Sequence, residues 1–266
     1  MSVWRREPSP VVAVAIGVGA SLFFIAIWAW LTRDGGPVSS LLMPSPRAFM
    51  DALWRLLRRP YLGNPLYVHI LSSLGVVLGG WLLAAIVGLP LGIAMAWWRR
   101  LRWIVFPVFQ LVRPVPPLAW IPLAIIWLGI GPGARMSVVF VAALVPWVMN
   151  SMQAVVSIDP VLVQAARTLG ASDRVVLSRV VARTALPTLI AGARIALGNA
   201  WTTLIAAELL AASSGLGYVA LNASRTLDTD ILLVAMAIIG ILGALLSFTM
   251  QIVARILAPW SRREAA

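Results

Sequence analysis

The sequence predicts an all-α polytopic membrane protein with about six transmembrane helices, and three observations support this fold class. Hydrophobic residues make up 61% of the 266 residues and charged residues only 11%, whereas soluble domains carry about 45–50% apolar and about 25% charged residues. The mean hydropathy is +0.94. Apolar runs of about 20 residues, the length that crosses a bilayer as a helix, recur along the chain. These features exclude an ordinary soluble enzyme and a disordered chain.

Six segments have the length and composition of a transmembrane helix. They cover residues 11–31, 70–96, 103–130, 136–158, 185–212 and 231–254. The first is longer than the 7–15-residue apolar core of a signal peptide, so we expect it to be retained as a span. The third contains Arg113 and prolines at 114, 116, 117 and 122, and neighbouring helices in a membrane accommodate such breaks.

The distribution of arginine predicts the orientation, because short loops rich in positive charge stay in the cytoplasm. The richer set of flanks contains Arg5, Arg6, Arg99, Arg100, Arg102, Arg167, Arg174, Arg179, Arg183, Arg255, Arg262 and Arg263. The poorer set contains Arg33, Arg47, Arg55, Arg58, Arg59, Arg135 and Arg225. We therefore expect both termini to be cytoplasmic and the 32–69 loop to be periplasmic. That loop contains an expected interfacial helix over 46–59, with Phe49, Leu53, Leu56 and Leu57 on one side.

Several residue types are absent, and each absence excludes a kind of site. The chain has no cysteine, which excludes disulfides and thiolate sites. Its single histidine, His69, which we expect at the membrane interface, disfavours a histidine zinc site and a Ser-His relay. It has no lysine, so it cannot contain a nucleotide-binding P-loop. The net charge of +12 is explained by topology rather than by nucleic-acid binding.

The expected cytoplasmic loop at 159–187 contains a short helix with clear end signals. Asp159 is placed to cap it, Pro160 occupies its first position, and Gly170 ends it in the left-handed conformation. Ser172 begins a second, amphipathic helix, and Pro187 precedes the fifth span. The apolar side of this second helix is Val175, Val176 and Val180, and the basic side is Arg174, Arg179 and Arg183. An incidental surface helix is the alternative interpretation.

Motifs in this loop and beyond it resemble a known family. Gln164-Ala165-Ala166-x₃-Gly170 is similar to the EAA loop of binding-protein-dependent ABC transporter permeases, with Gln164 in place of the usual glutamate and Ala182-Arg183 in place of Leu-Pro. Further similar runs are Arg113-Pro-Val-Pro-Pro-Leu-Ala-Trp120, Gly192-Ala-Arg-Ile-Ala-Leu-Gly198, Trp201-Thr-Thr-Leu-Ile-Ala-Ala-Glu208, Ala211-Ala-Ser-Ser-Gly-Leu-Gly-Tyr218 and Leu221-Asn-Ala-Ser224. They resemble the permeases for taurine, aliphatic sulfonates and nitrate, most closely those for taurine, over roughly residues 65–260.

This resemblance implies a type I ABC importer fold, a single permease domain over residues 1–266, and a location in the bacterial inner membrane. It implies a homodimer of this subunit, two ATPase subunits and a periplasmic substrate-binding protein. ATP and Mg²⁺ would be held by the ATPase, with no cofactor and no enzymatic activity in this chain. Gln164, Ala165, Ala166 and Gly170 would couple to the ATPase. The substrate would be taurine, a related sulfonate, nitrate or another small solute.

Charges within the spans are candidates for the translocation pathway, because they are expensive in a membrane. On the fifth span a single face contains Arg194, Gly198, Trp201, Ile205 and Glu208. Arg194 should lie towards the cytoplasm and either line the pathway or snorkel to the interface. Glu208, towards the periplasm, more plausibly pairs with an arginine or caps the 212–217 turn than contacts an anion.

The remaining pathway candidates lie at mid-depth of the fifth span and at the break in the third. Thr202 and Thr203 accompany Trp201 on the fifth span. At the break, Arg113 precedes Pro116, Pro117 and Trp120, and broken helices often line cavities. A structural pairing of Arg113 with Glu208 is the alternative. The 213–230 segment is expected to be a periplasmic gate, a dock for the binding protein or a plain re-entrant connector.

Two other classes of function remain as alternatives. A secondary transporter is disfavoured by the lack of an internal repeat and of a buried acidic pair. An integral-membrane enzyme is disfavoured because the nine acidic residues are scattered. Co-purification with a stoichiometric ATPase distinguishes the permease from both.

Overall fold

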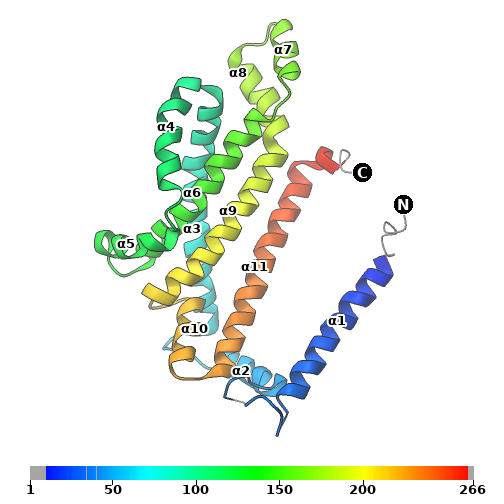
Figure 1. The fold of residues 1–266 in the computed structure, drawn as a ribbon, viewed down its shortest axis with the longest axis vertical. Coiled ribbons are helices and arrows are strands. Elements are labelled where there is room, and N and C mark those ends of the chain that lie inside the picture. The colour runs from blue at the N-terminus through cyan, green and yellow to red at the C-terminus, as the bar shows by residue number, and fades with distance from the viewer. Residues whose placement is uncertain (1–9, 34, 40, 263–266) are drawn as a thin grey trace. The chain divides into compact units, whose positions relative to one another are not determined.

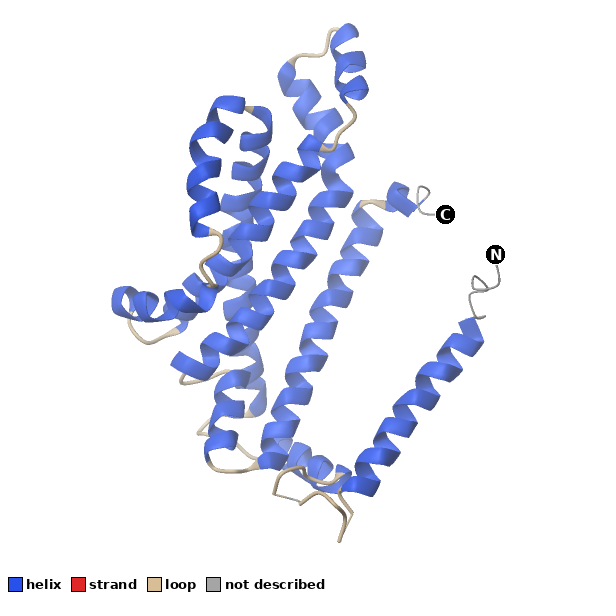
Figure 2. Ribbon diagram, in the orientation of Figure 1, coloured by secondary structure: helices blue, strands red, loops and turns tan. Residues whose placement is uncertain are grey.

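The computed structural model describes residues 10–33, 35–39 and 41–262, and in this part of the chain the regular elements are helices (Figures 1 and 2). The long helices are α1 (Pro10–Leu31), α3 (Leu66–Trp97), α6 (Pro132–Val156), α9 (Ala182–Ala211) and α11 (Thr229–Leu257). The shorter α-helices are α2 (Pro46–Arg58), α4 (Arg99–Val112), α5 (Ile121–Leu128), α7 (Pro160–Thr168), α8 (Asp173–Val175) and α10 (Leu216–Arg225). Two 3₁₀ turns (Pro117–Trp120, Pro259–Arg262) and one π-helical segment (Val176–Val181) complete the set.

Five of these helical stretches are long and apolar enough to cross a membrane, and a sixth span results if α4 and α5 are counted together. The prediction of about six transmembrane helices is therefore confirmed. The third predicted span is bent by 86° between α4 and the segment that contains α5. The prolines explain this bend, because proline removes a backbone donor and clashes with the preceding turn.

The fifth span begins earlier than predicted. The helix is continuous from Asp173 through α8, the π-helical segment and α9. Pro187 therefore lies inside α9 and does not precede it. The expected apolar side of the second loop helix is also partly wrong: Val176 and Val181 are buried, whereas Val175 is exposed and Val180 half-buried. The π-helical turn causes the difference, because its i→i+5 hydrogen bonds place more residues in each turn and shift the positions that face inward.

The chain divides into two compact units. The first contains the described residues up to Leu66 together with Ala220–Met236. In it, Ser45 caps α2 by accepting a hydrogen bond from the Ala48 amide at 3.2 Å. The predicted helix over 46–59 is confirmed, but its buried side is formed by Ala52 and Leu56, and Leu57 is exposed.

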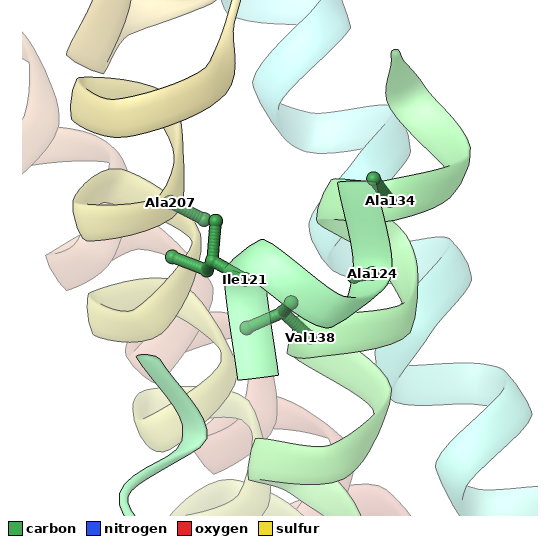
Figure 3. Packing of buried hydrophobic residues seen from close by; sticks show 5 residues of the cluster. All are labelled: Ile121, Ala124, Ala134, Val138 and Ala207. Atoms are coloured by element: carbon green, nitrogen blue, oxygen red, sulfur yellow. The ribbon is translucent and has the colours of Figure 1, made fainter. Parts of the chain in front are cut away.

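The second unit contains Tyr67–Val219 and the described residues from Ala237 on. Its core is formed by α3, α5, α6 and α9, with small residues at the closest approaches. Figure 3 shows one cluster, in which Ile121 and Ala124 of α5 pack against Ala134 and Val138 of α6 and Ala207 of α9. Without a hydrophobic driving force in lipid, such close packing of small side chains is what holds membrane helices together.

Glycines allow α3 and α6 to approach each other. A Cβ added to Gly80 would lie 2.7 Å from Val139 Cγ1 and 2.9 Å from the Met136 carbonyl oxygen. A Cβ added to Gly92 would collide with the Val148 carbonyl oxygen. These glycines are therefore required by the packing of the two helices.

We expect Gly92→Ala to destabilise the folded protein by about 1–3 kcal/mol, because the backbone of α6 must move away. The measurement is the midpoint of thermal unfolding of the detergent-purified protein. Gly75→Ala on the same helix is the matched control, since a Cβ there meets nothing within 4 Å and alanine is the better helix former. Equal midpoints for the two variants would contradict the packing role of Gly92.

Candidate functional site

A network of buried polar groups surrounds Glu208 near the end of α9. The Glu208 side chain is 0% exposed. The Ser73 hydroxyl of α3 lies 2.7 Å and 3.0 Å from its two carboxylate oxygens and donates to the carboxylate. The backbone N–H of Gly217, in the first turn of α10, donates to Oε2 at 2.9 Å. A carboxylate at a helix N-terminus is favoured by the free N–H groups and the helix dipole.

Arg135 provides the positive charge of this network. Its side chain is 2% exposed, and its Nη1 lies 3.5 Å from Glu208 Oε1. The same Nη1 donates to the Ser214 carbonyl oxygen at 2.8 Å. A buried ion pair avoids the larger cost of leaving either charge alone in the membrane. The pair therefore holds the turn that contains Ser214 against α6 and α9.

The 212–217 turn is also held by α3. The Gly215 N–H donates to His69 Nδ1 at 3.2 Å, and the Leu216 N–H donates to Ser73 Oγ at 3.0 Å. Gly215 has a φ of +121°, and a Cβ on it would collide with the Glu208 carboxylate. Glycine is thus the residue that this turn accommodates. These hydrogen bonds join α3, α6 and α9 to the turn, so they fix the turn in place.

A groove of about 570 Å³ runs between α9 and the later half of α11. Its walls are mainly aliphatic. The polar or small groups along it are Arg194, Gly198 and Trp201 of α9 and Gly243, Ser247 and Gln251 of α11. Arg194 Nε donates to Ser247 Oγ at 3.1 Å. The indole of Trp201 packs against Gly243, where a Cβ would lie 2.8 Å from Nε1.

At the break between α4 and α5 the arginine is exposed and the tryptophan is half-buried. Arg113 is exposed at the C-terminal end of α4. Trp120 packs against the cluster of Figure 3, and its Nε1 is buried without a hydrogen-bond partner. Broken membrane helices are tolerated where neighbouring helices pack around them.

The α7–α8 hairpin is built by local end signals, as predicted. Asp159 Oδ1 accepts a hydrogen bond from the Val161 amide at 2.8 Å and caps α7. At the other end, the Gly170 amide donates to the Arg167 carbonyl at 2.9 Å and the Ala171 amide donates to the Ala166 carbonyl at 3.0 Å. With Gly170 at a φ of +79°, these two bonds form a Schellman motif.

The hairpin has a packed side and an exposed side. Val163, Ala166 and Ala171 pack against the cluster that contains Val176 and Val181. Gln164, Ala165 and Gly170 are exposed. Leu169 is 88% exposed. Val161 and Leu162 are further exposed large hydrophobic residues of α7, and contiguous exposed apolar surface marks sites of interaction.

Comparison with known proteins identifies the family. The family model described as "Binding-protein-dependent transport system inner membrane component" matches residues 88–263. The chain belongs to this family. The permease is 36% identical over 258 residues to the taurine transport system permease protein of Escherichia coli (strain K12), covering 97% of this chain and 93% of that protein.

Other relatives place the permease in the taurine, sulfonate and bicarbonate branch. It is 34% identical to the putative aliphatic sulfonates transport permease protein of E. coli, over 89% of this chain and 88% of that protein. It is 29% identical to the bicarbonate transport system permease protein of Synechocystis, over 96% of this chain and 92% of that protein. A chain of the inward-facing MetNI methionine ABC transporter shares the fold, with a TM-score of 0.65 at 21% identity, over 72% of this chain and 95% of that chain. The permease is therefore a multi-pass membrane protein with a type I importer fold.

The structure separates the predicted pathway residues of the permease into three places. Arg113, Pro116, Pro117 and Trp120 lie at the break between α4 and α5, Trp201 lines the groove, and Glu208 lies in the polar network. Thr202 Oγ1 lies 3.2 Å from the Gly198 carbonyl oxygen, and Thr203 is half-buried. The predicted set does not form one site.

Two expectations about charged and polar residues are corrected. The arginine that pairs with Glu208 is Arg135, which was assigned to a loop flank, and not Arg113. His69 is buried in the network and is not interfacial. Beside Arg194, the Ala193 carbonyl accepts a hydrogen bond from Trp81 Nε1 of α3 at 3.1 Å.

Proposed function

We propose that this permease is the transmembrane subunit of an ATP-driven importer for a small anionic or zwitterionic solute. The substrate that we propose is taurine or a related sulfonate. The α7–α8 hairpin carries the proposal: local caps build it, its inner side is packed, and Leu169 and Ala165 remain exposed on its outer side. The relatives named for taurine and aliphatic sulfonates support the substrate class. The chain has no lysine for a nucleotide-binding loop, so ATP and Mg²⁺ belong to the partner.

In this proposal the hairpin and both termini face the cytoplasm of a bacterial inner membrane. Two copies of the permease assemble with two ATPase subunits, and a periplasmic binding protein delivers the solute. Exposed Gln164, Ala165 and Leu169 contact the ATPase, whereas half-buried Ala166 and the cap residue Gly170 maintain the hairpin. The permease binds no cofactor and contributes no covalent chemistry.

The test is reconstitution of the complete transporter in proteoliposomes with its ATPase and binding protein. We expect ATP-dependent uptake of taurine, with ethanesulfonate, nitrate and bicarbonate as competitors that rank the substrate classes. Uptake driven by an ion gradient in a permease that purifies without an ATPase would instead establish a secondary transporter and overturn the proposal.

A further inference from the structure

Arg194 is a cation within an apolar groove. The groove between α9 and α11 has a volume of about 570 Å³ and is lined mostly by aliphatic side chains. Arg194 is its one ionisable lining residue in the described part of the chain, and Ser247 and Gln251 are polar neighbours on α11. A cation in such surroundings attracts an anion strongly, because low-dielectric walls focus its field.

Arg194 lies inside α9 and not at either of its ends. Twelve residues of the 30-residue helix α9 precede it. The carbonyl of its neighbour Ala193 accepts a hydrogen bond from Trp81 Nε1 of α3 at 3.1 Å, so this part of α9 is packed against another long helix.

The guanidinium of Arg194 is exposed and bonded to α11 through its Nε. Its Nε donates to Ser247 Oγ at 3.1 Å, which ties the side chain to α11. A guanidinium has further N–H groups in a planar fork that matches two oxygens of a sulfonate or a carboxylate. One turn further along α9, exposed Gly198 keeps the wall free of a side chain.

We propose that the α9–α11 groove is a binding site for a small organic anion within the membrane, and that Arg194 binds its sulfonate or carboxylate group. This inference rests on the proposed function, because it places the transported anion on a defined path. It assigns the anion contact to Arg194 and not to Arg113, which is exposed at the end of α4 and outside this groove.

The absence of cysteine in the chain allows a test with a single reporter thiol. Gly198→Cys places a thiol in the groove at a position where a Cβ meets nothing within 4 Å. In the reconstituted transporter, we expect it to react about tenfold faster with a sulfonate-bearing methanethiosulfonate than with a trimethylammonium-bearing one, because Arg194 concentrates anions. Saturating taurine should slow the reaction. Adding Arg194→Gln should remove the preference.

Gly240→Cys is the matched control on α11. It is also an exposed helical glycine with open space at its Cβ, but it does not line the groove. We expect slow labelling there, with no effect of Arg194→Gln or taurine. Equal behaviour of the two reporters, or a charge preference at Gly198→Cys that survives Arg194→Gln, would overturn the inference.

Transport measurements distinguish a failure of this inference from a failure of the proposed function. If the unmodified transporter takes up no anion on ATP hydrolysis, the proposed function fails. If it takes up taurine and Arg194→Gln leaves the KM and rate unchanged, only the assignment of Arg194 fails. We expect Arg194→Gln to reduce taurine uptake at least about tenfold, Arg194→Lys to retain part of it, and Arg113→Gln to leave it near the unmodified level.

Discussion

We expect Leu169→Glu to abolish ATP-dependent uptake while the permease still folds and inserts. Leu169 is 88% exposed at the end of α7, so a charge there costs the isolated permease little. In the proposed complex the same side chain contacts the ATPase, where a carboxylate that replaces an apolar contact is left desolvated and unpaired. We expect the affinity for the ATPase to fall by more than about tenfold. Co-purification of the ATPase with tagged permease measures this directly.

Leu169→Met is the control, because it preserves an apolar side chain of similar volume. Ala165→Arg, at another exposed position of α7, should weaken the complex as Leu169→Glu does. Unchanged ATPase binding and uptake in both charged variants would show that the exposed side of the hairpin is not the docking surface. Ala166 is unsuitable for this experiment, since it packs against the Val176 cluster and its replacement would disturb the hairpin itself.

The sequence predicts the features that depend on neighbouring residues. Asp159, Pro160 and Gly170 lie within a dozen positions and determine both ends of α7 without help from the rest of the fold. Long apolar runs likewise predict the spans, because the bilayer dictates their length. Pro187 misleads for a related reason: proline is a common helix boundary, but here the helix begins before the π-helical turn and continues through it.

The polar network is assembled from residues that are distant in the sequence. Its members come from α3, α6, α9 and the 212–217 turn, and only helix packing brings them together. One local signal was present: His69 and Ser73 are spaced by four residues in an apolar run, which places two polar side chains on one helix face. The role predicted for Glu208, a carboxylate that pairs with an arginine and caps the turn, agrees with the structure. Its partner Arg135 could not be identified from the sequence, because the arginine distribution places it with the arginines of the loop flanks.

Glu208→Ala should destabilise the folded permease by about 3–5 kcal/mol, because it leaves Arg135 as an unpaired buried charge and removes the acceptor of the Gly217 N–H. The midpoint of an SDS unfolding titration in mixed micelles measures the loss. Glu208→Gln keeps an acceptor for the Gly217 N–H but provides no counter-charge for Arg135. Its stability should therefore lie between that of Glu208→Ala and that of the unmodified protein.

A double-mutant cycle separates the ion pair from the other contacts of Glu208. If the charges stabilise each other, Arg135→Met combined with Glu208→Gln costs less than the sum of the two single changes, by about 1–3 kcal/mol. Some loss must remain, because Arg135 also donates to the Ser214 carbonyl oxygen. Strict additivity would mean that the two charges, 3.5 Å apart, do not stabilise each other, and Glu208 would then act on the turn through its bonds with Ser73 and Gly217 alone. Such a result would make Glu208 a helix cap and not a charge partner.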